Sequence, residues 1–415
     1  MTETPRPQTA SAPPGATYKV LLLENIHPSA DERFSGANLE IERLKGALKE
    51  DELIEALAGV HMLGIRSKTQ VTKRVLESAS SLLSVGCFCI GTNQVDLTTA
   101  NRHGVPVFNA PFSNTRSVAE MVIAEIIILA RQLGDRSREV HVGKWRKVAT
   151  GCYEVRGKTL GVVGYGHIGP QLGVLAEALG MRVIFYDIAA KLPMGNNKSV
   201  ASLNDLLSQS QFVSLHVPET PETKNMIGAA QLAAMPKGSY LINASRGTVV
   251  DVAALATALA SGHLAGAAVD VYPSEPEANT DAFVTELANL PNVILTPHIG
   301  GSTEEAQEAI GREVSNTLTK FLTSGATAGA VNFPQVDLPP YKNAHRILNV
   351  HRNVPGVLRD VNRIVGDRNA NIDSQYLSTD ANIGYLIMDV EGDASADISR
   401  QIQALPTNIR TRVLY

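Results

Sequence analysis

The chain has 415 residues, of which 44% are hydrophobic, and its formal net charge at pH 7 is −4. This length exceeds the size at which a single hydrophobic core keeps growing, so two or three domains are expected. Acidic and basic residues are interspersed along the chain, which gives no reason to expect a nucleic acid or an anionic membrane as partner.

Residues 1–17 are rich in Pro, Thr and Ala and lack the apolar stretch of a signal peptide, so they are predicted to form a flexible tail. No apolar run reaches the roughly 18 residues that a membrane span requires. Three cysteines are too few for a disulfide framework, and their spacing does not suggest a metal site. These features predict a cytoplasmic protein with reduced thiols.

From Tyr18 onward, short apolar runs alternate with helical patterns. KVLLLEN, HMLGIRS, LLSVGCFC and VPVFNAP are predicted strands, and an acidic and basic segment from Arg43 to Leu57 is a predicted helix. This order indicates βαβ units and a parallel sheet.

A long helix is predicted over SVAEMVIAEIIILARQL, residues 117–133, with Asn114 or Thr115 as its cap. Its apolar residues cover almost the whole circumference, so it must be buried nearly all round. Two alternatives fit: a helix at a subunit or inter-domain interface, or an ordinary core helix.

A second set of predicted strands runs from Thr159 to His298: TLGVVGYG, MRVIFYD, FVSLHVP, SYLINAS, AGAAVDV and NVILTPH. Right-handed crossovers would place their carboxyl ends along one edge of one sheet, where ligands bind in open α/β folds.

The first of these strands leads into a glycine turn with the spacing GxGxxG, formed by Gly164, Gly166 and Gly169. Gly164 permits a tight turn, Gly166 lets a pyrophosphate approach the backbone, and Gly169 allows close packing of helix and strand. Asp187 ends the next strand and can accept hydrogen bonds from ribose hydroxyls, whereas its charge would repel a 2′-phosphate. The pattern predicts an NAD site; the alternative is a glycine turn in a βα unit that binds no nucleotide.

Hydride transfer from an alcohol needs a base for the hydroxyl proton and a cation near the developing carbonyl oxygen. It also needs a group that keeps the pKa of the base near the working pH. His298, Arg246 and Glu275 follow three strands of the same predicted sheet and supply one candidate each. Each alone has an ordinary structural explanation, but together they predict an active site.

Beyond His298, a long amphipathic helix leads to ATAGAVNFPQVDLPPY, residues 326–341, which is predicted to be a linker. From Arg346 the predicted order of elements is βαββαβ, a small ferredoxin-like unit.

Arg246 within NASRG, Glu275 within SEP and His298 within TPHIGGS resemble the catalytic residues of the D-isomer-specific 2-hydroxyacid dehydrogenases. The resemblance implies that His298 is the general acid/base, that Glu275 raises its pKa, and that Arg246 holds the substrate carboxylate. It also implies that Asp270 binds the nicotinamide carboxamide. The remaining implied cofactor residues are His167, Ile168, His216, Val217, Pro218 and Ser245.

The resemblance further implies an α/β fold in which a Rossmann-type cofactor domain (residues 114–300) is inserted in a flavodoxin-like substrate domain (18–113 and 301–336). The βαββαβ unit, residues 343–415, resembles an ACT domain, a regulatory module that binds amino acids.

RSKTQVT, GCFCIGTNQVDL and FNAPFSNTRSVAE are most similar to family members that act on 3-phosphoglycerate. This implies that Arg66, Lys68 and Lys147 bind the substrate. The better-known members carry Arg where this chain has Lys68, and lysine keeps the charge but loses the bidentate fork. His351, Asn353 and Asn371 match ACT positions that bind serine in feedback-inhibited members, and pairing of ACT domains implies a homotetramer.

Two other functions stay open from the sequence. One is an oxidoreductase for another 2-hydroxyacid, for instance an enzyme that acts on 2-oxoglutarate or hydroxypyruvate. The other is an NAD-sensing binding protein on the same fold. The sequence implies no metal site.

Overall fold

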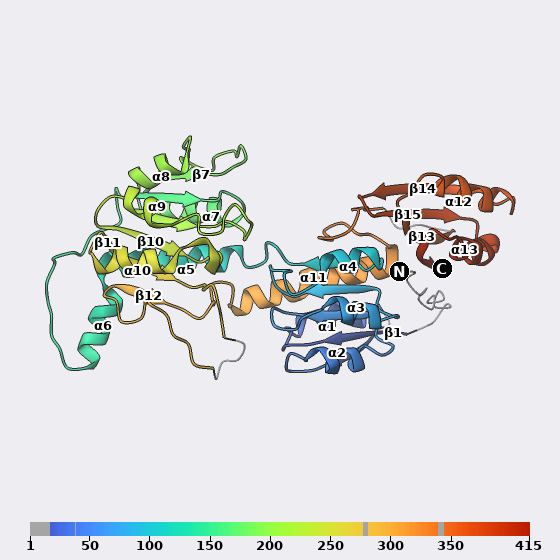
Figure 1. The fold of residues 1–415 in the computed structure, drawn as a ribbon, viewed down its shortest axis with the longest axis horizontal. Coiled ribbons are helices and arrows are strands. Elements are labelled where there is room, and N and C mark those ends of the chain that lie inside the picture. Colours follow the sequence, from blue (N-terminus) through green and yellow to red (C-terminus); the bar gives the residue numbers. More distant parts are fainter. Residues whose placement is uncertain (1–16, 38, 277–280, 339–343) are drawn as a thin grey trace. The chain divides into compact units, whose positions relative to one another are not determined.

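The computed structural model describes residues 17–37, 39–276, 281–338 and 344–415 (Figure 1). Residues 1–16 of the expected tail lie outside this part of the chain. The chain divides into two compact units: unit 1 is Met1–Ser113 with Gln307–Tyr415, and unit 2 is Asn114–Ala306. In the described part of the chain, no helix is both long and apolar enough to cross a membrane.

Unit 1 contains a parallel five-stranded sheet in the order β2-β1-β3-β4-β5, which is the flavodoxin-like order. Its strands are β1 (Tyr18–Leu22), β2 (Leu39–Arg43), β3 (Met62–Ile65), β4 (Ser84–Cys87) and β5 (Val107–Asn109). Helices α2 (Glu50–Ala56), α3 (Lys73–Ser78) and α4 (Leu97–Arg102) pack on one face. Helices α1 (Ser29–Ser35) and α11 (Glu304–Ser324) pack on the other.

The predicted helix from Arg43 to Leu57 is wrong over its first part. Residues Leu39–Arg43 form the edge strand β2, and only Glu50–Ala56 are helical. Leu39 and Ile41 alternate with the exposed Glu40 and Glu42, a period-2 pattern with only two apolar residues. The short helix α1 was not predicted at all.

The segment predicted to be a linker is packed into the core of unit 1 over its described residues, 326–338. Ala330, Phe333 and Val336 are buried in the same cluster as α11, and Val331 donates its amide proton to the carbonyl of Val107 at 2.9 Å. Proline content was misleading here, because alternate residues of the segment are apolar and find partners only in the folded unit.

The C-terminal part of unit 1 has the predicted βαββαβ order. Its antiparallel sheet β14-β15-β13-β16 consists of β13 (His345–Arg352), β14 (Ile372–Thr379), β15 (Ile383–Val390) and β16 (Asn408–Leu414). Helices α12 (Val357–Gly366) and α13 (Ser395–Gln403) bury their apolar sides on one face, and the short 3-10 helix η2 (Gly392–Ala394) precedes α13. The opposite face shares the apolar cluster of α11, through Leu348, Val350 and Tyr385.

Unit 2 is a seven-stranded parallel sheet in the order β12-β11-β10-β9-β6-β7-β8. Its strands are β6 (Thr159–Val163), β7 (Arg182–Tyr186), β8 (Lys198–Ser199), β9 (Phe212–Leu215), β10 (Ser239–Asn243), β11 (Leu264–Val269) and β12 (Val293–Leu295). The helical elements are α5 (Thr115–Arg131), α6 (Leu133–His141), α7 (Ile168–Ala178), α8 (Leu203–Gln209), α9 (Ala229–Ala234), η1 (Gly247–Val249) and α10 (Val252–Ala260). The strand order reverses between β6 and β9, so a Rossmann-type crevice is expected at their carboxyl ends.

Helix α5 is a core helix of unit 2. Val118, Val122, Ile126 and Leu129 are buried in the cluster that covers one face of the sheet. The other side of α5 is only partly covered, so the helix is less deeply buried than its composition predicts.

Candidate active site

The glycine turn follows β6 and meets the end of β9. Gly164 has φ +91°, and a Cβ there would collide with the carbonyl of His216. A Cβ at Gly169 would lie 2.6 Å from the carbonyl oxygen of Gly164, so only glycine lets α7 start this close to β6. At Gly166, by contrast, a Cβ would meet nothing within 4 Å. That space is compatible with a bound pyrophosphate, and His167 and Ile168 begin α7 directly behind it.

Asp187 lies directly after β7 and is held by two backbone groups. Its carboxylate accepts hydrogen bonds from the amides of Tyr165 and Ala189, at 2.8 and 2.9 Å. Two amide donors leave acceptor capacity on both oxygens, so the side chain is oriented and can still bind hydroxyl groups. The next residue in the chain, Ile188, is apolar and 96% exposed, so it brings no positive charge to Asp187.

His216 follows β9, and burial lowers its pKa to about 4. Its Nε2 lies 2.8 Å from the hydroxyl of Ser214, whereas Nδ1 is buried without a hydrogen-bond partner among the described residues. Of the two residues that follow, Val217 is partly buried and Pro218 is exposed. A neutral imidazole with one unpaired nitrogen fits beside a polar ligand at the switch point, so these residues fit an NAD site.

The turn after β10 carries Arg246 and is fixed by Asn243. The amide oxygen of Asn243 accepts from the backbone amide and hydroxyl of Ser245, at 3.1 and 2.7 Å, and its amide nitrogen donates to the carbonyl of Arg246 at 3.0 Å. A Cβ at Gly247 would collide with the backbone of Tyr272, so this turn packs against the loop after β11. Asn243 was not predicted as a site residue, although it begins the motif NASRG.

His298 and Glu275 form a hydrogen bond, with 2.9 Å between Nδ1 of His298 and Oε2 of Glu275, and the contact becomes an ion pair when His298 is protonated. This hydrogen bond raises the pKa of His298 despite partial burial, which acts in the opposite direction. Burial favours a raised pKa for Glu275, but its hydrogen bond and charge interaction with His298 outweigh burial and lower it. Arg246 lowers the pKa of both groups electrostatically, so the three predicted catalytic residues lie together in unit 2.

Asp270 holds the loop that carries His298. One carboxylate oxygen accepts from the hydroxyl of Thr296 and the amide of Ile299, at 2.6 and 2.8 Å, and the other accepts from the amide of Gly300 at 2.8 Å. Between these anchors His298 has φ +54°, a conformation that L-residues seldom adopt and that needs support from its surroundings. Asp270 is thus engaged with protein groups, a role that sequence reasoning did not predict.

The predicted substrate residues belong to different units. Arg66 and Lys68 follow β3 in unit 1, where Arg66 is partly buried and Lys68 is exposed. Lys147 belongs to an exposed segment of unit 2.

The predicted effector residues all lie in the C-terminal βαββαβ part. His351 is buried, with Nδ1 2.9 Å from the amide oxygen of Asn349, and burial lowers its pKa. Asn353 is exposed and donates to the carbonyl of Asp380 at 2.7 Å, and Asn371 is exposed before β14. Asn353 follows the end of β13, whereas Asn371 precedes the start of β14, which lies level with the start of β13, so these two exposed amides are at opposite ends of the sheet. His351 belongs to a buried polar network.

Known proteins match the chain in two ways. Residues 123–300 match the family described as D-isomer specific 2-hydroxyacid dehydrogenase, NAD binding domain, and residues 347–410 match an AHAS small subunit-like ACT domain. D-3-phosphoglycerate dehydrogenase from Dictyostelium discoideum is 57% identical, covering 97% of this chain and 98% of that protein. The Escherichia coli K12 enzyme of the same name is 52% identical, covering 96% and 97%.

Among solved structures, the NAD complex of a D-isomer specific 2-hydroxyacid dehydrogenase from Lactobacillus delbrueckii ssp. bulgaricus is 27% identical, with a TM-score of 0.66. It covers 76% of this chain and 100% of its own. The chain belongs to the D-isomer specific 2-hydroxyacid dehydrogenase family and is an NAD-dependent oxidoreductase. Over nearly its whole length it is similar to D-3-phosphoglycerate dehydrogenases in particular. The predicted fold class, the NAD cofactor and the ACT module are confirmed.

Proposed function

We propose that this protein oxidises 3-phospho-D-glycerate to 3-phosphohydroxypyruvate with NAD, the first step of the phosphorylated route to serine. The observation that carries the proposal is the His298–Glu275 pair, which lies in the same unit as Arg246 and the glycine turn. The names of the full-length relatives support the choice of substrate.

His298 is the general acid/base. A carboxylate can only accept hydrogen bonds, so Nδ1 of His298 donates to Glu275, and the neutral ring keeps a lone pair on Nε2. In the oxidation, Nε2 takes the proton of the C2 hydroxyl while the C2 hydride leaves and the C–O bond becomes a carbonyl. NAD, when bound, accepts that hydride. The negative charge of Glu275 then stabilises the imidazolium.

Arg246 supplies a cation for the substrate carboxylate and the developing carbonyl oxygen. Its Nη1 donates to the carbonyl of Ser245 at 2.7 Å, which fixes part of the guanidinium and leaves other donors for substrate. Asn243, Ser245 and Gly247 set this geometry from the protein side.

The cofactor is bound by the glycine turn, with Gly164, Gly166 and Gly169 shaping it and Asp187 binding the ribose of NAD. His167, Ile168, His216, Val217, Pro218 and Ser245 line this part of the site. Asp270 combines its hold on the His298 loop with a remaining acceptor site for the nicotinamide carboxamide. Arg66, Lys68 and Lys147 bind the anionic groups of the substrate.

Regulation by serine is part of the proposal. The ACT match over residues 347–410 supports an amino-acid effector, and we assign His351, Asn353 and Asn371 to it, of which the two amides are exposed. We also propose a homotetramer formed with paired ACT domains, and reduction of 2-oxoglutarate to 2-hydroxyglutarate as a side activity.

The test is the oxidation of NADH, followed by absorbance, with phosphohydroxypyruvate, hydroxypyruvate and 2-oxoglutarate in parallel. The proposal expects phosphohydroxypyruvate to give the highest kcat/KM and NADPH to be a poor substitute for NADH. Higher turnover of an unphosphorylated oxo acid would contradict the assigned substrate. A protein that binds NADH but oxidises it with none of these compounds would be a sensing protein instead.

A further inference from the structure

The loop between β1 and α1 has an unusual backbone. Glu24 and Asn25 have φ +60° and +51°, so two consecutive non-glycine residues are left-handed. Such a conformation costs on the order of 1 kcal/mol or more per residue and persists only where its surroundings impose it. Glu24 is also a buried carboxylate, with 8% of its surface exposed.

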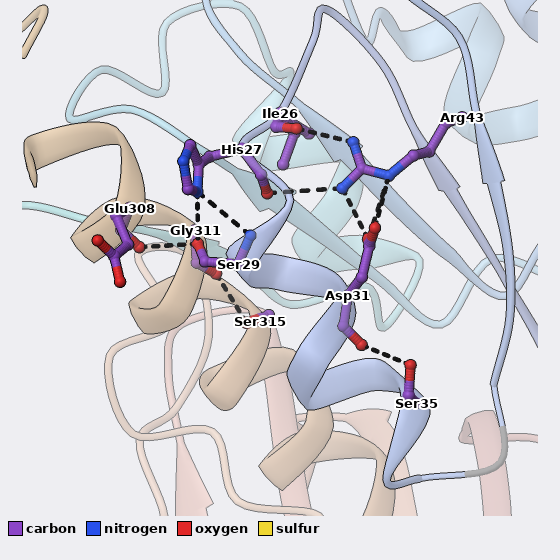
Figure 2. A network of polar contacts seen from close by, with 9 residues as sticks. All are labelled: Ile26, His27, Ser29, Asp31, Ser35, Arg43, Glu308, Gly311 and Ser315. Carbon is purple, nitrogen blue, oxygen red and sulfur yellow. Dashed lines mark hydrogen bonds and ion pairs between the residues drawn. The ribbon is translucent and has the colours of Figure 1, made fainter. Parts of the chain in front are cut away.

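A polar network holds the residues that follow Glu24 and Asn25 in this loop (Figure 2). Nη1 of Arg43 donates to the carbonyl of Ile26 at 2.7 Å, and the same guanidinium pairs with Asp31 of α1 at 2.6 Å. The hydroxyl of Ser29 donates to the carbonyl of Glu308 on α11 at 2.9 Å and lies 3.0 Å from Nδ1 of His27. The loop is therefore tied to β2, α1 and α11, and Glu24 is presented from a fixed backbone.

The carboxylate of Glu24 accepts three backbone amide protons from the loop after β3. Oε1 accepts from Arg66 and Thr69 at 3.2 and 2.9 Å, and Oε2 accepts from Lys68 at 3.0 Å. From the other side, the amide of Gln94 donates to the carbonyl of Arg66 at 2.7 Å. This is the loop that carries the two cations assigned to the substrate.

Converging backbone amides make a binding site for an anion, and here Glu24 fills it. These three donors are therefore not available to the substrate. A carboxylate close to an anionic substrate would repel it, but the amide dipoles offset the charge of Glu24 locally.

We propose that Glu24 is a positioning residue that acts as the internal anion of the loop 66–69, so that the side chains of Arg66 and Lys68, rather than the loop amides, bind the anionic tail of the substrate. The proposal rests on the proposed function for the identity of that substrate. In this proposal, the side chains of Arg66 and Lys68 determine specificity for a substrate with an anionic tail, because Glu24 fixes the backbone of the loop that carries them.

The experiment compares Glu24→Gln and Glu24→Asp with wild type in the reduction of phosphohydroxypyruvate. Glutamine presents an NH2 group to one of the three amides, and aspartate withdraws the carboxylate by one methylene. Losing charged hydrogen bonds of this kind should raise KM by about tenfold or more for Glu24→Gln and less for Glu24→Asp. The kcat and the affinity for NADH, measured by its fluorescence, should change little, because unit 2 is untouched.

Glu42→Gln is the matched control, because it removes the same charge from an exposed position of β2 and should leave KM unchanged. If Glu24→Gln does not fold, Glu24→Asp decides the question. A wild-type KM in Glu24→Asp, or a fall in kcat at constant KM, would overturn the inference. Absence of wild-type turnover with phosphohydroxypyruvate would instead count against the proposed function.

Discussion

Nδ1 of His298 and Oε2 of Glu275 lie 2.9 Å apart, although the two residues follow different strands, β12 and β11. The pair raises the pKa of His298 and lowers that of Glu275. Each residue therefore favours the charged form of the other, and the pH dependence of catalysis should depend on both.

Replacing Glu275 by Gln should shift the pH profile of the reaction to lower pH. Without the negative charge the pKa of His298 falls, so the protonated ring needed for reduction of the oxo acid is lost at lower pH than in wild type. The expected loss of kcat for reduction at neutral pH is about 10²-fold, as for other disrupted acid/base pairs. The measurement is kcat for reduction from about pH 5 to about pH 9, a range that includes the ordinary pKa of histidine.

His298→Ala is the companion variant. It should lose most turnover in both directions while binding NADH with nearly wild-type affinity, because the glycine turn is unchanged. Normal turnover in His298→Ala, or an unshifted profile in Glu275→Gln, would contradict the assigned roles.

Two glycines of the same turn should respond differently to alanine. At Gly166 a Cβ has free space in the protein, so Gly166→Ala should keep the melting temperature and weaken NADH binding by about tenfold, since the methyl group occupies room for the pyrophosphate. At Gly169 a Cβ would lie 2.6 Å from the carbonyl oxygen of Gly164. Gly169→Ala should therefore lower the melting temperature, with an overpacking cost of about 1–3 kcal/mol.

Calorimetry and NADH fluorescence titration on both variants check this pair of expectations. If Gly166→Ala lowered the melting temperature but left NADH binding unchanged, the space beside Gly166 would not be the binding site of the pyrophosphate.

Glu125 should make unit 2 less stable as pH rises. It is 3% exposed, its carboxylate has no hydrogen-bond partner among the described residues, and burial, together with the nearby Asp270, raises its pKa to about 8. The folded state therefore holds a proton that the unfolded chain releases near its ordinary pKa of 4.5. Stability falls between these two values and then levels off.

Glu125→Gln removes this dependence and keeps the side-chain volume. Between pH 5.5 and pH 8 the wild type should lose on the order of 3 kcal/mol relative to the variant. Melting temperatures across this range measure the difference, and Glu120→Gln on the exposed side of α5 is the control. Parallel curves for wild type and Glu125→Gln would show that Glu125 does not titrate in this range.

Lys68→Arg should strengthen binding of the phosphorylated substrate. Arginine restores a planar fork that matches phosphate, and Lys68 is exposed, so the longer side chain has room. A gain on the order of 1 kcal/mol would lower KM about fivefold. Steady-state kinetics with phosphohydroxypyruvate and hydroxypyruvate show whether the change in KM depends on the phosphate group. An equal change in KM for both substrates would argue against a contact between residue 68 and the phosphate.

Much of the fold and the cofactor site could be predicted because their signals are local. The glycine turn, the strand before it and Asp187 all lie within one βαβ unit, and the apolar runs between Thr159 and His298 are long enough to indicate buried strands. The edge strand β2 and the packed segment 326–338 were misassigned because their apolar residues are few and depend on distant partners.

The supporting residues could not be predicted for the same reason. Glu24 lies 42 residues from Arg66, and its role appears only when the ends of β1 and β3 adjoin in the sheet. Glu125 is one of two acidic residues in the mainly apolar helix α5, and nothing in that pattern indicates that it is buried near Asp270. Sequence patterns identify groups that act on ligands more readily than groups that act on other residues.

Asn353→Ala should weaken inhibition by serine without changing the uninhibited rate. The side-chain amide of Asn353 is exposed and bonded only to the carbonyl of Asp380 among the described residues, so removing it costs little stability. If it binds the effector, the serine concentration for half inhibition should rise about tenfold, the loss of one or two hydrogen bonds to a charged ligand. Asn382→Ala is the control, because the backbone carbonyl of Asn382, not its side chain, accepts the amide proton of Asn353. Equal serine sensitivity in wild type and Asn353→Ala would remove Asn353 from the effector site. If Asn353→Ala and Asn382→Ala lost serine inhibition equally, the cause would be a local structural effect instead.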